Sequence, residues 1–355
     1  MANSQTFRLL RVVLGSAFLL GLFVFLLRRG GFPVIPPKEA LSKVSPSVLI
    51  SYCIAWTGIL LVRSIRWRYL LMSIAPVAWW RVISVSLVGF GALALFPLRL
   101  GEAVRPTLIR RAGVGWWEAV GTVGAERVMD GLFLTATLAV ALFTSTATWL
   151  KPLPDHIGAF PVNVGVVPGA TTGALFMFAT LFVALGLFYW SREFTQRLIE
   201  VTIGRISERA AAWIVSVMSR VAAGLSFLPN LRYMVPFIAW TSVYWTFNAV
   251  ALMWLMRGCG LTSATLGQAW VAMGILGLGV VIPQAPGFFG AFQLSLFAGL
   301  ALFFRTDVVI STGAVFVFYC YLIQVGLTTL IALFSWVFGV WHDWKTTTTE
   351  ANIRA

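Results

Sequence analysis

Charged residues are scarce in this sequence: Asp, Glu, Lys and Arg make up 11% of its 355 residues, and only 12 residues are acidic. Hydrophobic residues make up 59%. A water-soluble fold has too small an interior to bury that much apolar surface, so the expected solvent is lipid. The scarcity of charge therefore excludes an ordinary soluble domain, and each ionisable side chain near an apolar run becomes a candidate for function.

Histidine and cysteine are almost absent as well. The two histidines, His156 and His342, lie far apart, and the three cysteines, Cys53, Cys259 and Cys320, are scattered without a CxxC pair. No HExxH, GxSxG or phosphate-binding loop is present. With no metal-ligand set, disulfide framework or nucleophile–base pair, we expect a protein that is not an enzyme and needs no metal or cofactor.

What the sequence does contain is a series of apolar runs, several of which approach or exceed the roughly 20 residues that a helix needs to cross a bilayer. The runs cover residues 9–27, 47–62, 82–97, 118–148, 170–190, 233–256, 266–283, 287–304 and 308–341. The first ends at Arg28 and Arg29 without a clear cleavage site, which favours a retained helix over a signal peptide. We predict an all-α polytopic membrane protein, with one transmembrane domain over residues 1–345 and a short cytoplasmic tail over 346–355.

Two of these runs, 82–97 and 287–304, are short, and each lies beside a Pro/Gly break. The breaks are FPLRLGEAVRP, residues 96–106, and IPQAPGFFGAFQ, residues 282–293. Non-helical backbone at membrane depth is tolerated where it lines a cavity, and interrupted segments in both halves of a chain indicate a transporter's binding site. We predict about six full spans and two re-entrant helical hairpins that face each other. Two short helices with proline kinks are the alternative.

The distribution of Lys and Arg predicts the orientation. If both hairpins return to their own side, most of these residues lie on the side of the two termini, which the positive-inside rule places in the cytoplasm of a plasma (inner) membrane. The hairpins then enter from opposite sides, in an inverted arrangement. In a soluble protein the net charge of +14 would suggest nucleic acid, but here it indicates topology signals and anionic lipid headgroups.

Ionisable side chains gather at the first break and at the start of the following run: Arg99, Glu102, Arg105, Glu126, Arg127 and Asp130. Glu126 and Asp130 are four residues apart and share a helix face. Charges near a span usually face the bundle interior and pair with one another, or mark a substrate path. A structural ion-pair lock with Arg99 or Arg105 and a substrate site both remain open at this point.

Residues 96–132 resemble the first signature of the lysylphosphatidylglycerol synthase transmembrane region, a flippase-like membrane family. The shared pattern is a Pro, R-x-G-E, a further Arg and then E-R-x-x-D: Pro97, Arg99, Gly101, Glu102, Arg105, Glu126, Arg127 and Asp130. The second break resembles the family's P-x-x-P-G-G-x-G stretch at Pro283, Pro286, Gly287 and Gly290. Phe288 replaces a usual glycine, and Gln293 replaces a usual glutamate. A hydrogen-bonding role remains available at position 293, because an amide still accepts and donates hydrogen bonds.

The resemblance implies a protein that moves an anionic phospholipid or an isoprenoid-linked lipid between leaflets. The matching residues and Gln293 are then the substrate or transport residues, with Arg99 and Arg105 holding the phosphate. The best-known members carry a soluble synthase domain, and we expect none here because the chain ends at Ala355. A scaffold that assists a separate lipid- or glycan-modifying enzyme is the alternative. Membrane lipids are the expected partners, and a partner enzyme and a homo-oligomer stay open.

Overall fold

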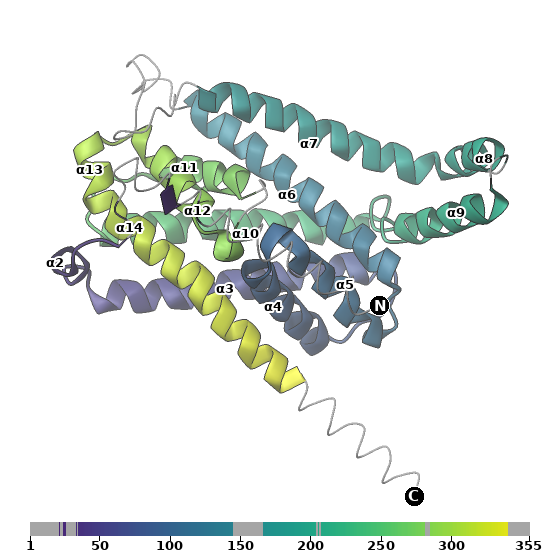
Figure 1. Ribbon diagram of the computed structural model, residues 1–355, viewed down its shortest axis with the longest axis horizontal. Helices are drawn as coiled ribbons and strands as arrows, with labels where there is room; N and C mark the ends of the chain where they lie inside the picture. Colours follow the sequence, from purple (N-terminus) through teal and green to yellow (C-terminus); the bar gives the residue numbers. More distant parts are fainter. Residues whose placement is uncertain are drawn as a thin grey trace, which may run out of the picture.

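The computed structural model describes residues 35–144, 166–203, 207–280 and 285–339, together with 21, 24, 25, 33 and 205. These residues form helices and connections without a strand, which confirms the predicted all-α class (Figure 1). Most of the first expected span, the C-terminal tail, both histidines and Pro283 lie outside the described residues.

The helices follow the apolar runs closely. They are α2 (Lys38–Leu41), α3 (Pro46–Leu71), α4 (Trp79–Leu95), η1 (Pro97–Ala103), α5 (Val104–Ile109), η2 (Arg110–Ala112), α6 (Trp116–Thr144), α7 (Val166–Trp190), α8 (Arg192–Thr202), α9 (Glu208–Ala223), α10 (Leu231–Gly258), α11 (Leu266–Gly279), η4 (Pro286–Phe288), α12 (Ala291–Ala301), α13 (Thr306–Ile310), α14 (Thr312–Tyr321) and the π-helical turn η5 (Leu322–Leu327). After η5 the helix continues to Gly339.

Within the described residues, three helices are long and apolar enough to cross a membrane: Pro46–Leu71, Gly169–Trp190 and Thr312–Gly339. Helices α6 and α10 are as long, with 29 and 28 residues, but carry polar side chains. Large apolar side chains such as Phe176, Leu187 and Phe334 lie exposed on the outside of the bundle, as contact with lipid requires. The chain is therefore an integral membrane protein, and the number of full spans stays a prediction.

Helix α3 is longer than the apolar run predicts. It continues past residue 62 to Leu71, because Trp67, Leu70 and Leu71 extend its buried face. Arg63, Arg66 and Arg68, which lie beyond the apolar run 47–62, are consequently part of this helix. The region between 190 and 231, expected as a connection, also contains two helices, α8 and α9.

Helices α3 and α10 pack along each other and run antiparallel. Arg66 reaches Thr241 at one end, and Trp254 donates to Ser51 towards the other. Helices α2 and α13 lie at one end of the molecule, and α8 and α9 lie at the opposite end (Figure 1).

The first break turns the chain back along α4. A Cβ atom on Gly101 would lie 2.3 Å from the backbone carbonyl of Ala92, so only glycine allows η1 to approach α4 this closely. The second break does the same between α11 and α12, where Gly299 approaches Ala272. η1 and η4 contact each other. Because α4 follows the end of α3 and α11 follows the end of the antiparallel α10, the two hairpins start at opposite ends of the bundle.

Candidate functional site

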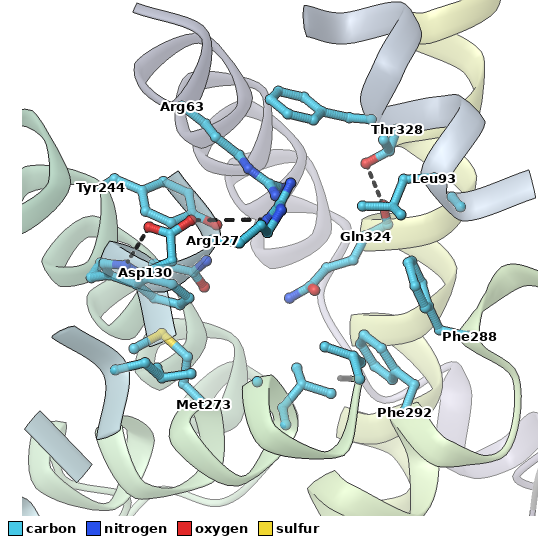
Figure 2. A pocket seen from close by; sticks show the side chains of 18 of the residues that line it. Arg63, Leu93, Arg127, Asp130, Tyr244, Met273, Phe288, Phe292, Gln324 and Thr328 are labelled. Atoms are coloured by element: carbon cyan, nitrogen blue, oxygen red, sulfur yellow. Dashed lines mark hydrogen bonds and ion pairs between the residues drawn. The ribbon is translucent and has the colours of Figure 1, made fainter. Parts of the chain in front are cut away.

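A cavity of about 540 Å³ lies where the two breaks meet. Its polar wall carries Arg63, Arg99, Glu102, Arg127 and Asp130, and most of the remaining wall is aromatic or aliphatic. Figure 2 shows Arg63 and Arg127 on one side and Phe288 and Phe292 on the other. The space is therefore amphiphilic, with a charged wall and an apolar chamber.

Four charged side chains form a buried network beside the cavity, the inner cluster: Arg66, Arg105, Glu126 and Asp130. Arg66 donates to Glu126 at 2.8 Å and to both carboxylate oxygens of Asp130. Arg105 pairs with Glu126 at 2.7 Å. Their side chains are between 0 and 10% exposed, and the two positive charges balance the two negative ones.

Helix geometry and packing place this network. Glu126 and Asp130 are one turn apart on α6, so both face Arg66 on α3. Trp245 of α10 donates to Asp130 at 3.3 Å, and the Arg105 guanidinium lies 4.9 Å from the centre of the Trp67 ring. All four carboxylate oxygens of Glu126 and Asp130 accept guanidinium hydrogen bonds, whereas Nε of Arg66 and Nη2 of Arg105 have no partner among the described residues. The ion pairs of the inner cluster thus connect α3, α5 and α6, and breaking one of them would leave a buried charge unpaired.

A second group, the outer cluster, faces the cavity: Arg63, Arg99, Glu102 and Arg127. Glu102 pairs with Arg99 at 3.1 Å and with Arg127 at 3.5 Å. Arg127 is also 3.9 Å from Asp130, which links the two clusters. The three side chains in these pairs are 24 to 27% exposed. Three guanidinium groups against one carboxylate give the outer cluster an excess of two positive charges.

Arg63 contributes most clearly to that excess. Among the described residues no carboxylate lies within ion-pair distance of its guanidinium, which instead lies 4.2 Å from the Phe90 ring centre and 5.9 Å from that of Tyr244. Arg63 and Arg127 extend towards each other (Figure 2), and their like charges repel. An anion between them would relieve this repulsion.

The second break supplies shape rather than charge. Gly287 and Gly290 adopt φ angles of 72° and 88°, which glycine tolerates without strain. Phe288 has a φ angle of 58°, so the backbone keeps a conformation that favours glycine at the position where the family pattern has a glycine. The phenyl ring of Phe288 lines the cavity. Pro286 begins η4.

Gln293 has a capping role. Its side chain is buried, and its Oε1 accepts a 2.7 Å hydrogen bond from the backbone N–H of Gly290 at the start of α12. Within the described residues the cavity wall does not include Gln293.

The structure thus brings most of the predicted site residues together but divides their roles. Arg99, Glu102, Arg127 and Asp130 line the cavity. Arg105 and Glu126 lie behind its wall in the inner cluster, where Arg105 pairs with Glu126, whereas Arg99 lines the cavity. A phosphate-binding role for Arg99 and Arg105 stays a prediction. Gly101, Gly287 and Gly290 shape the two turns.

Sequence reasoning missed several residues that matter: Arg63, Arg66, Tyr244, Asn248, Gln324 and Thr328. The two arginines lie beyond the apolar run 47–62 and outside both breaks, so sequence reasoning did not select them. Their spacing of three, followed by Trp67 and Leu70, was the available signal for a continuing helix. Asn248 and Gln324 are isolated polar residues in apolar runs, which is itself a sign of a polar path.

The fold and site define an all-α membrane protein with an amphiphilic, positively charged cavity. A family model, the lysylphosphatidylglycerol synthase TM region, matches residues 12–332, and the chain belongs to this family. No curated protein and no solved structure matches the sequence. Membership in this family fits a membrane protein related to lipid handling.

Proposed function

We propose that this protein moves an amphiphilic lipid with an anionic headgroup, an anionic phospholipid or an isoprenoid-linked phosphate, between the leaflets of a plasma membrane. The observation that carries the proposal is the outer cluster, whose excess of two positive charges faces an otherwise largely apolar cavity. A phosphate would bind between the guanidinium groups, and hydrocarbon would contact the aromatic walls.

The hairpins supply the path. A headgroup that crosses hydrocarbon alone loses its polar contacts, at a cost of several kcal/mol for a charge. Two re-entrant hairpins whose breaks meet at a polar cavity would lower that barrier. With both termini in the cytoplasm, the first hairpin enters from the cytoplasm and the second from outside.

The test is leaflet-resolved lipid transfer in proteoliposomes, with fluorescent phosphatidylglycerol, an isoprenoid phosphate and phosphatidylcholine as substrates. We expect the protein to accelerate transfer of at least one anionic lipid, and Arg63→Met to remove most of that activity. Arg68→Met is the matched control, since Arg68 lies on the same helix, stacks on Trp79 and is outside the cavity wall. Transfer equal to that in protein-free vesicles, or transfer unaffected by Arg63→Met, would overturn the proposal and favour a scaffold.

A further inference from the structure

The cavity contains a second polar region that the charged clusters do not explain. Asn248 on α10 and Gln324 on η5 line the cavity, and they are 7% and 9% exposed. Gln324 extends towards the centre of the cavity (Figure 2). Both are amides rather than charged groups, and both lie in helices that are otherwise mostly apolar.

These amides retain hydrogen-bonding capacity. Asn248 makes no side-chain hydrogen bond to any described residue, while the Gln324 Nε2 donates to the Tyr52 hydroxyl at 2.9 Å and to the Cys320 sulfur at 3.3 Å. The Gln324 Oε1 has no partner among the described residues. Neither amide is among the fully buried polar groups that lack a partner, because both line the cavity. Their free hydrogen-bonding atoms are therefore accessible to a ligand in the cavity.

Gln324 lies in an irregular turn of its helix. A π-helical turn, Leu322–Leu327, interrupts a long membrane helix, and such turns frequently mark functional sites. The neighbouring Thr328 accepts a 2.9 Å bond from Trp56, so this part of the wall is tied to α3.

The two polar regions lie at different depths. On α3, Trp56 is seven residues from Arg63, which is two helical turns or about 10 Å. On the antiparallel α10, Phe247 contacts Gly58, so Asn248 lies near the level of Trp56. Asn248 is one turn, about 6 Å, beyond Tyr244, the ring next to Arg63.

We infer that Asn248 and Gln324 form an uncharged second binding layer, which takes the hydroxyl-bearing part, a glycerol or a sugar, of the headgroup whose phosphate the outer cluster binds. This inference rests on the proposed lipid substrate. A hydroxyl both donates and accepts, so it satisfies amides in either orientation. A phosphate only accepts and an ammonium only donates, so each leaves part of the layer unsatisfied.

Binding of short-chain lipids to the detergent-solubilised full chain, measured by isothermal titration, tests this layer. Dioctanoyl phosphatidylglycerol and dioctanoyl phosphatidylmethanol carry the same single negative charge, but only the first has free hydroxyls. We expect the wild type to bind phosphatidylglycerol about three- to tenfold more tightly, the effect of one net hydrogen bond. Asn248→Leu should remove this preference and leave the phosphatidylmethanol affinity unchanged, whereas Arg63→Met should weaken both lipids alike.

Gln324→Met is the second variant, used if Asn248→Leu lowers the melting temperature strongly. Equal wild-type affinities for the two lipids, no wild-type binding of either, or an equal loss for both lipids in Asn248→Leu would overturn the second layer. Tighter binding of phosphatidylethanolamine than of phosphatidylglycerol would overturn its assignment to hydroxyls. Preserved discrimination without lipid transfer in proteoliposomes would instead leave the layer standing and refute the translocation function.

Discussion

The inner and outer clusters use the same two residue chemistries, guanidinium and carboxylate, for different ends. The inner cluster is buried and neutral, and its carboxylates are fully engaged by Arg66 and Arg105. The three ion-paired side chains of the outer cluster are about a quarter exposed, and the cluster has more arginine than carboxylate. The two clusters differ in the ratio of their charges, and the role proposed for the outer cluster rests on this difference, because only a surplus of positive charge can attract an anionic substrate.

Helix α3 offers the sharpest way to break this comparison, since Arg66 and Arg63 are three residues apart and belong to different clusters. We predict that Arg66→Met destabilises the fold by about 3–5 kcal/mol. The substitution removes the buried ion pair of Asp130 with Arg66 and one of the two ion pairs of Glu126. Arg63→Met should leave the melting temperature in detergent nearly unchanged, since no carboxylate among the described residues lies within ion-pair distance of Arg63. Equal melting temperatures for the two variants would show that the clusters do not differ in this way.

A second prediction concerns the turn that presents the outer cluster. A methyl group on Gly101 would collide with the backbone of Ala92, so Gly101→Ala should displace η1 and cost about 1–3 kcal/mol, with loss of lipid transfer. Gly124→Ala on α6 is the control, because nothing lies within 4 Å of its Cβ position and alanine favours the helix. Normal stability and transfer in Gly101→Ala would mean that η1 does not pack against α4 as described.

The third prediction separates binding from transfer. Glu102→Gln removes the carboxylate that partly neutralises Arg99 and Arg127, and the outer cluster then has three excess positive charges instead of two. The pairs are partly exposed, so the stability cost should stay below about 1 kcal/mol. We expect anionic lipid to bind more tightly in titration and to transfer more slowly in proteoliposomes, because release becomes limiting. Weaker binding would assign Glu102 to substrate contact instead.

Much of this arrangement follows from sequence reasoning alone. Scarce charge made Arg99, Glu102, Arg127 and Asp130 conspicuous, and the Pro/Gly breaks located both turns. The pairing partners did not follow, because they depend on how α3 rotates against α6 and on a helix that continues beyond its apolar run. For the same reason the sequence left the lock and the substrate site as alternatives, whereas the structure contains a cluster suited to each.

Gln293 shows a different kind of limit. Its family counterpart, a glutamate, suggested a transport role, yet a residue three positions into a helix can face either the cavity or the helix start. The structure places its Oε1 on the Gly290 N–H. Only the packing of α12 against its neighbours decides between those two directions, and the local sequence does not contain that information.

The smallest expected effect is that of Gln293→Glu, which introduces a charged side chain at the second break, where the described residues are uncharged. A carboxylate can accept the same hydrogen bond from Gly290, and a negative charge in the first turn of α12 is favoured by about 0.3–1 kcal/mol. Desolvation of the buried charge opposes this gain, so transfer should change by no more than about twofold. Gln293→Leu, the matched variant, leaves the Gly290 N–H without its acceptor and should cost about 1–2 kcal/mol in thermal unfolding.

Transfer measured in proteoliposomes at several pH values tests whether position 293 takes part in transport. The Glu variant should follow the wild-type pH profile, because Gln293 lies outside the cavity wall. A pH-dependent gain in transfer would instead identify position 293 as a proton-coupling site that this chain lacks, and the cap would then be only part of its role.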